Sequence, residues 1–124
     1  MLDSPVAQQQ VSLRLRVLHQ AIIAFGPGKA DLLQAIINTG SISQAAKHMD
    51  MSYRRAWQLV TTMNQCFVSP LVETQTGGSQ GGGAVVTPLG QEILQLFRQM
   101  EQAALSASTP FYQQISRHLK DQLI

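Results

Sequence analysis

The chain has 124 residues, of which 44% are hydrophobic and only 13% are charged, and its formal net charge is +2. That apolar content can supply the core of one ordinary domain and excludes wholesale disorder, whereas so small a net charge does not by itself identify a nucleic-acid-binding protein. Cys66 is the only cysteine, so an internal disulfide is excluded and a reduced, cytoplasmic setting fits best.

The N-terminal part predicts a flexible segment followed by a β-hairpin. Residues 1–10 are polar and lack the pattern of a secretory signal, and no apolar run in the chain is long enough to span a bilayer. Residues 11–18 alternate between apolar and polar side chains, which is the period of a half-buried strand. The apolar run over 21–25 predicts a second strand that pairs with the first, and Gly26-Pro27-Gly28 ends it.

The first and second helices are expected next. Residues 29–39 carry an apolar stripe at helical spacing, and Gly40 suits the position just past a helix end. Ser41 predicts the N-cap of the second helix, and Gln44 three residues later completes the S-x-x-Q pattern of a capping box.

A third helix and a small hairpin follow. Ser52 predicts the N-cap of this helix, and Pro70 marks its end. The apolar seam of the helix consists of Ala56, Val60, Met63 and Phe67. Residues 71–74 and 84–86 predict two strands around a loop over 75–83, and such a hairpin in this place is the wing of a winged helix.

The C-terminal part predicts two more helices. Thr87-Pro88 combines an N-cap with a proline at the first helical position, and Thr109-Pro110 repeats this signal, so a fifth helix is expected to begin there. The fourth helix carries a heptad seam of apolar residues. The seam consists of Leu89, Ile93, Leu96, Met100 and Ala103, and it is widened by Leu94 and Phe97. It predicts a dimerisation surface, although the same seam could pack on the chain's own strands and first helix. The predicted dimerisation residues are Leu89, Ile93, Leu96, Phe97 and Met100.

Residues 40–63 together have the layout of a helix-turn-helix, which places the N-terminal end of its second helix in the major groove of DNA. The residues presented there are Ser52, Tyr53, Arg54 and Arg55, with Gln58 one turn later. Arginine can donate two parallel hydrogen bonds to guanine, and glutamine can pair with adenine in the same way. The competing interpretation is a solvated helix start. Which arginine contacts a base and which a phosphate is left open, and Tyr53 could stack, bind a phosphate or pack on the wing.

Other candidate DNA contacts lie on the preceding helix and on the wing. Ser43 and Lys47 are candidates for phosphate contacts, whereas Ser41 is interpreted as a cap alone. The glycine-rich wing tip lets a backbone approach DNA closely, although it could equally be a loose hairpin tip. The wing candidates are Thr76, Gly77, Gly78, Ser79 and Gln80.

The remaining residues that could bind a ligand or react are predicted to have structural roles. Trp57 lies one position from the apolar seam of the third helix and is predicted to be a core anchor, with DNA contact as the alternative. Cys66 is predicted to be a packed thiol. The three histidines lack metal-ligand spacing, both among themselves and with Cys66. We therefore expect no metal site, no cofactor and no enzymatic activity.

Several long motifs carry a family resemblance. They are FGPGKADLLQAI, GSISQAAKHMDMSYRRAWQLV, MNQCF and PLVETQTGGSQGGGAVVTPLGQEIL, and with the arm that follows they cover about residues 11–105. In order and spacing the chain resembles the N-terminal DNA-binding domain of ModE-type molybdate-responsive regulators, which is related to the winged helix-turn-helix of LysR-type regulators. The resemblance implies a homodimer joined through the long fourth helix and N-terminal elements. It also implies DNA contact through residues 52–58 and the wing at 76–83, and a link to molybdenum uptake or molybdenum enzymes.

One departure from the family bears on ligand sensing. Full-length ModE-type regulators carry C-terminal molybdate-binding β-barrel modules, whereas residues 106–124 of this sequence are typical of helix. No residue of this chain can be named as a molybdate ligand, so a molybdate site is not predicted and the small-molecule effector is unknown.

The sequence thus predicts a mainly α fold with small β-hairpins. A flexible N-terminus over 1–10 precedes a winged helix-turn-helix DNA-binding domain over 11–87, and a helical dimerisation arm over 88–124 follows. The predicted function is a sequence-specific transcriptional regulator that binds double-stranded DNA, as a homodimer on an inverted repeat, without membrane association. An architectural DNA binder and a protein-interaction adaptor on the same fold remain open as alternatives.

Overall fold

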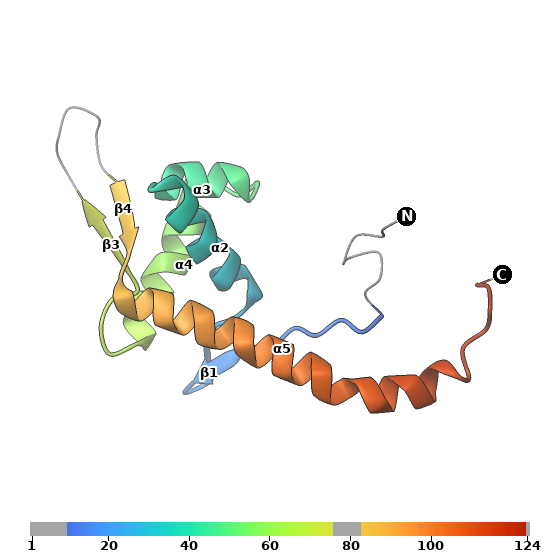
Figure 1. The fold of residues 1–124 in the computed structure, drawn as a ribbon. Coiled ribbons are helices and arrows are strands. Elements are labelled where there is room, and N and C mark those ends of the chain that lie inside the picture. Colours follow the sequence, from blue (N-terminus) through green and yellow to red (C-terminus); the bar gives the residue numbers. More distant parts are fainter. Residues whose placement is uncertain (1–9, 76–82, 124) are drawn as a thin grey trace.

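The computed structural model describes residues 10–75 and 83–123, and the statements below concern those residues. Its elements follow the order β1 (Val17–His19), β2 (Ile22–Phe25), α2 (Pro27–Thr39), α3 (Ile42–His48), α4 (Tyr53–Cys66), β3 (Val72–Gln75), β4 (Gly83–Val86) and α5 (Pro88–Ser116). Figure 1 shows α2, α3 and α4 gathered into one body, with the β3–β4 hairpin on one side and α5 running past it into an arm. The predicted mainly α winged helix-turn-helix with a long C-terminal helix is therefore confirmed.

The core lies where α2, α4, β2 and the start of α5 meet. Its largest fully buried side chains are Phe25, Leu32, Leu33, Ile36, Met63 and Leu71. The ring of Phe25 packs edge-on against Phe67 at 6.3 Å and against Phe97 at 5.2 Å between ring centroids. One aromatic side chain of β2 thus joins the end of α4 to α5, which fixes the arm to the body.

The predicted helix caps are confirmed, with one correction. Ser41 Oγ accepts a hydrogen bond from the Gln44 backbone N–H at 3.1 Å, and Gly40 adopts the left-handed conformation with φ of 72° just after α2. Ser52 Oγ accepts from the Arg55 N–H at 3.0 Å in the same way. The capping box at Ser41 is only half formed, because its backbone N–H donates to the hydroxyl of Thr39 at 3.3 Å instead of to Gln44.

The wing is anchored to the body at both of its ends. At the tip-side end of β4, the Ala84 N–H donates to the carbonyl of Gly40 at 2.9 Å. At the start of β3, Asn64 of α4 accepts from the Leu71 N–H at 2.8 Å and donates to the carbonyl of Val72 at 3.0 Å. These bonds hold the wing beside α4 and the turn before α3.

The N-terminal strand is shorter than the sequence predicts. The β1–β2 hairpin forms, but regular strand begins only at Val17, so the prediction of a strand over 11–18 is wrong for residues 11–16. Those six residues nevertheless alternate between half-buried and exposed side chains. They run beside α5 (Figure 1). There Leu13 lines a shallow cavity with Arg98 and Leu105. The alternation therefore reflects packing on a helix.

The predicted break at Thr109-Pro110 is also wrong, because α5 continues through Pro110 to Ser116. A proline inside a helix removes one backbone hydrogen bond and bends the axis, and Figure 1 shows α5 changing direction in its last part. Thr109 does not cap a new helix. Its hydroxyl donates back to the carbonyl of Leu105 at 3.3 Å, and Ser108 donates to the same oxygen at 2.7 Å.

No helix among residues 10–75 and 83–123 is long and apolar enough to cross a membrane. The predicted flexible N-terminus falls almost entirely on residues 1–9, and the wing-tip candidates fall on residues 76–82; both stretches lie outside the described residues.

Candidate nucleic-acid interface

The N-terminal half of α4 presents basic side chains to solvent. Ser52 caps the helix, and Arg54 and Arg55 in its first turn are exposed, as is Lys47 in the last turn of α3. Within the described part of the chain, the ion pairs are those of Arg98 with Asp31 and Glu101, so no carboxylate neutralises these three cations. The helix N-terminus adds a partial positive charge to the same end. The arrangement suits a polyanion.

The direction of each side chain on α4 follows from its angular position, since successive helix residues turn by about 100°. Ala56, Val60 and Met63 are buried at 0%, 2% and 0% exposure and define the inner side. Arg54 and Gln58 occupy the opposite side, at the centre of the exposed face. Arg55 lies instead on one flank of this face, while Tyr53 and Trp57 lie on the other.

The flank with the aromatic residues faces the wing. Tyr53 and Trp57 stack with ring centroids 6.3 Å apart and planes 8° from parallel. They line a groove of about 310 Å³ together with Ser43 at the start of α3 and with Thr74 and Gln75 of β3. Tyr53 thus stacks on Trp57 and faces β3 across this groove, with 55% of its surface exposed.

The prediction that Trp57 anchors the core is wrong, because its side chain is 42% exposed. The inner position next to it belongs to Ala56, which has no exposed surface. The small alanine lets α3 and α4 cross closely, and no space remains there for an indole. Trp57 is therefore a surface residue beside the basic residues of α4, which the sequence pattern did not reveal.

A buried lysine of α2 lies beside the other flank of α4, and the sequence pattern did not predict its burial. Lys29 is 8% exposed, and its ammonium donates to the carbonyl of Ile23 at 2.9 Å. Burial lowers the pKa of Lys29; Cys66 opposes this effect, while the positive charge of Arg55 lowers the pKa further. Arg55 and Gln58 line a shallow depression on this side with Lys29 and Ile22. Cys66 is only half-buried.

Of the residues considered on and before α3, two are exposed and one caps the helix. Ser43 is exposed and lines the groove shared with Trp57, and Lys47 is exposed in the last turn of the helix. Ser41 acts as a cap, as expected. The wing candidates Thr76–Gln80 lie outside the described residues.

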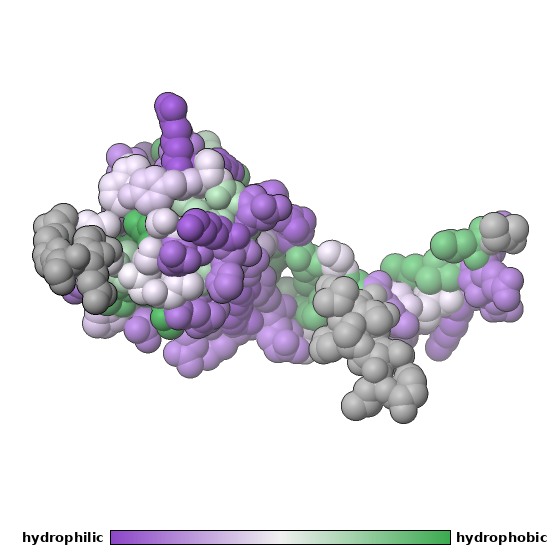
Figure 2. All heavy atoms as spheres, turned by 90° about the horizontal axis from the view of Figure 1, so that it is seen from above, coloured by the Kyte–Doolittle hydropathy of each residue, from purple (hydrophilic) through white to green (hydrophobic). Residues whose placement is uncertain are grey.

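The predicted dimerisation seam divides between the core and the surface. Leu96 and Met100 are 51% and 40% exposed, and Leu89 and Ile93 are half-buried. Phe97 is only 3% exposed and packs on Phe25, so its side chain is already covered within this chain. Seen from above, hydrophilic and neutral residues cover the helix-turn-helix body, whereas hydrophobic residues gather along α5 beyond it (Figure 2).

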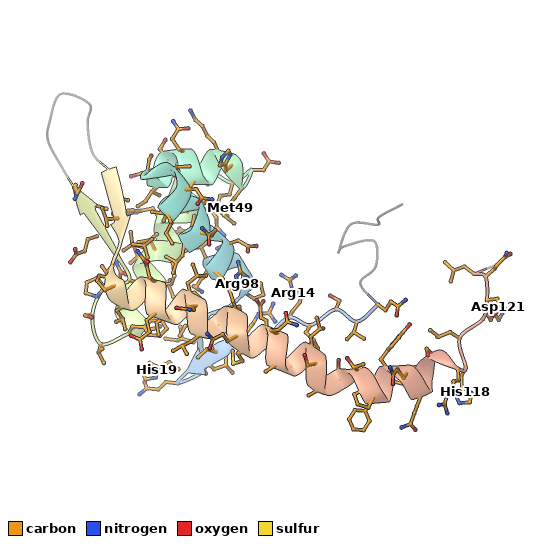
Figure 3. All side chains as sticks on the ribbon, viewed as in Figure 1. Arg14, His19, Met49, Arg98, His118 and Asp121 are labelled. Atoms are coloured by element: carbon orange, nitrogen blue, oxygen red, sulfur yellow. The ribbon has the colours of Figure 1, made fainter. Side chains whose placement is uncertain are left out.

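The residues that could ligate a metal lie apart. His19 is on the β1–β2 hairpin and His118 lies beyond the end of α5 (Figure 3). Among the residues that the structure places, no three His, Cys, Asp or Glu side chains come together as a cation site.

Comparison with known proteins places this geometry in a family. The model of the bacterial regulatory helix-turn-helix protein, lysR family, matches residues 29–91. That range extends from α2 through α3, α4 and the wing to the start of α5. It contains every candidate DNA contact named above.

Curated relatives resemble the same part of the chain. The DNA-binding transcriptional dual regulator ModE of Escherichia coli K12 is 44% identical over 90 residues, which are 73% of this chain and 34% of that protein. The transcriptional regulator ModE of Haemophilus influenzae is 36% identical over 93 residues, 75% of this chain and 36% of the relative. The molybdenum-pterin-binding protein MopB of Rhodobacter capsulatus is 40% identical over 85 residues, 68% and 32% of the two chains.

The chain therefore spans about a third of the length of these relatives, and the similarity concerns their helix-turn-helix part. The resemblance to ModE-type DNA-binding domains is confirmed. Because the family model covers more than half of the 124 residues, the chain belongs to the lysR family of bacterial regulatory helix-turn-helix proteins.

Proposed function

We propose that this protein is a sequence-specific transcriptional regulator that binds double-stranded DNA through α4 and the wing. The observation that carries the proposal is the exposed basic end of α4, which no carboxylate of residues 10–75 and 83–123 neutralises and which lies between α3 and the wing of a regulatory helix-turn-helix. A helix in this position enters the major groove with its N-terminal residues against base edges.

The positions on α4 suggest a division of roles. Arg54 and Gln58 occupy the centre of the exposed face, so we assign them to base edges, where bidentate pairs with guanine and adenine discriminate by about 1–3 kcal/mol. Arg55 on the flank and Lys47 on α3 are assigned to phosphates, which position the protein without selecting sequence. Ser43, Ser52, Tyr53 and the wing residues Thr76–Gln80 complete the proposed surface.

Selection from a random duplex pool tests the function directly. The wild-type protein is expected to enrich one sequence, and its affinity is expected to fall steeply with salt because phosphate contacts release counterions. Retention of DNA without an enriched sequence would favour an architectural binder. No retention at low salt would favour a protein-interaction adaptor.

Two arginine variants test the division of roles. Arg54→Ala is expected to relax the preference at one base position, whereas Arg55→Ala should weaken binding to all duplexes and reduce the salt slope by about 1. Arg14→Ala removes the same charge from an exposed site on the N-terminal segment, outside α4, and serves as the control. An Arg54→Ala protein with an unchanged base preference would contradict our orientation of α4.

The assembly and the target genes are proposed on separate grounds. Leu96 and Met100 expose apolar surface on α5, and we propose a homodimer that uses this surface on an inverted repeat.

The relatives named after molybdenum and ModE lead us to propose promoters of molybdenum-related genes as targets. Because no molybdate ligand can be named, calorimetry with molybdate is expected to show no binding to this chain. A DNA-binding regulator of this kind would act in the cytoplasm.

A further inference from the structure

Two large aromatic side chains lie exposed on the wing-side flank of α4. Tyr53 is 55% exposed and Trp57 is 42% exposed, and their rings stack one helical turn apart. The pair presents an apolar surface to water beside the exposed Arg54 of the same helix. An apolar surface beside functional polar groups marks an interaction site more often than a solitary exposed residue does.

The residues around this pair indicate which kind of ligand it can contact. On one side it borders Arg54 and Gln58, which are assigned above to base edges. On the other side it opens into the groove of about 310 Å³ that reaches Thr74 and Gln75 of the wing. The pair therefore lies where a DNA strand would pass between the major groove entered by α4 and the wing. Arg54 beside the pair, Arg55 on the opposite flank of α4 and Lys47 on α3 have no carboxylate partner in the described residues, which favours a phosphate-bearing occupant of the surface as a whole.

In the major groove, the C5-methyl group of thymine is the apolar feature among hydrogen-bonding base edges. The guanidinium of Arg54 and the amide of Gln58 cannot detect it, whereas an indole or phenol ring can pack against it. On the basis of the function proposed above, we propose that the Tyr53–Trp57 pair packs on thymine methyl groups and makes Trp57 a specificity-determining residue for thymine on the wing side of the site.

The experiment compares thymine with uracil, which differs from it only by that methyl group. Duplexes are first selected from a random pool by the wild-type protein, and each thymidine of the enriched sequence is then replaced in turn by deoxyuridine. At one or two positions the affinity should fall about four-fold, the loss expected for one buried methyl-sized group. The other replacements should leave the affinity unchanged.

Variants assign this methyl dependence to the aromatic pair. Trp57→Ala should bind thymine and uracil duplexes equally, while Trp57→Phe keeps an apolar ring and should retain part of the difference. Phe111→Ala removes another exposed aromatic residue, on the arm, and should keep the full wild-type difference. Trp57 is also the only tryptophan of the chain, so its fluorescence reports contact at this site and should change when the selected duplex binds.

The outcomes separate this inference from the proposed function. Equal affinity of the wild-type protein for thymine and uracil at every position would overturn the inference while leaving sequence-specific binding intact. The same holds if Trp57→Ala keeps the full wild-type difference, or if the enriched sequence has no thymine. Failure of the wild-type protein to retain any duplex at low salt would overturn the proposed function, and this inference with it.

Discussion

Lys29 keeps a charged side chain inside the body, where it joins the start of α2 to the carbonyl of Ile23 in β2. Because burial lowers the pKa of Lys29 in the folded protein, the unfolded chain binds more protons between that lowered pKa and the ordinary lysine value of about 10.4. The free energy of unfolding therefore rises with pH across this window. The stability gained in this way is lost as the pH falls through the lowered pKa.

The free energy of unfolding of the wild-type protein, relative to that of Lys29→Met, is therefore expected to rise as the pH is raised through this window. Urea unfolding of both proteins between neutral pH and about pH 10.5 measures the difference, in which the contributions of groups that do not interact with Lys29 cancel. A difference that falls with increasing pH would contradict the described environment of Lys29.

Gly90 lies where α5 passes closely over the base of the wing. A Cβ at this position would meet the carbonyl oxygen of Leu71 and would lie 2.7 Å from Val86 Cγ1. Gly90→Ala is therefore expected to destabilise the protein by about 1–3 kcal/mol through overpacking. Gly28→Ala is the matched control, because a Cβ there meets nothing within 4 Å and alanine favours the helix. The urea midpoint should fall for Gly90→Ala and rise for Gly28→Ala. Equal midpoints of the two variants would contradict the close approach of α5 to the wing.

Residues whose roles depend on their immediate neighbours were predictable, and residues whose roles depend on packing were not. The hydroxyls of Ser41, Ser52 and Thr87 cap helices because their partners lie three residues further along the chain. The exposure of Trp57 is different, because it depends on the closeness of α3 to α4. The burial of Lys29 likewise depends on the carbonyl of Ile23 in a separate element.

At the scale of elements, α5 shows that a Thr-Pro pair is ambiguous. The pair marks a helix start at Thr87-Pro88, where the Thr87 hydroxyl accepts from the Gly90 N–H at 3.0 Å. It lies inside α5 at Thr109-Pro110, where the hydroxyl donates to the preceding turn. The side-chain pattern is the same in both places. What differs is whether a helix already precedes the pair, and residues 88–108 are helical without interruption.

Pro110→Ala should restore the backbone hydrogen bond that proline cannot donate and should straighten the arm. Because proline costs about 3 kcal/mol relative to alanine in a helix interior, the variant is expected to gain helical circular dichroism and thermal stability. Thr109→Ala, which leaves the proline in place, is the control and should gain neither. A loss of helical signal in Pro110→Ala would instead support a separate fifth helix that starts at the proline.

At the scale of the whole molecule, the exposed apolar residues of α5 carry the proposal that two protomers, and not one, meet the DNA. The sequence predicted a single seam, but the fold uses Phe97 for the core of the protomer and leaves Leu96 and Met100 at the surface. Periodicity could not separate these roles because neighbouring positions of a wide apolar stripe differ only in which partner they face. The arm continues beyond the body with Phe111 and Ile115 also exposed, at 68% and 59%.

If two copies pair through this surface, two α4 helices can enter successive major grooves roughly 34 Å apart. The double variant Leu96→Glu/Met100→Glu adds two charges to the surface without disturbing the core, so sedimentation at micromolar concentration should change from dimer to monomer. The monomer should lose affinity for the inverted repeat but keep its preference for a single half-site, since α4 is unaltered. Gln95→Glu, on a different side of the same helix, should remain dimeric. A double variant that sediments as a dimer would place the interface elsewhere, and a wild-type protein that sediments as a monomer would remove the geometric reason to expect an inverted repeat.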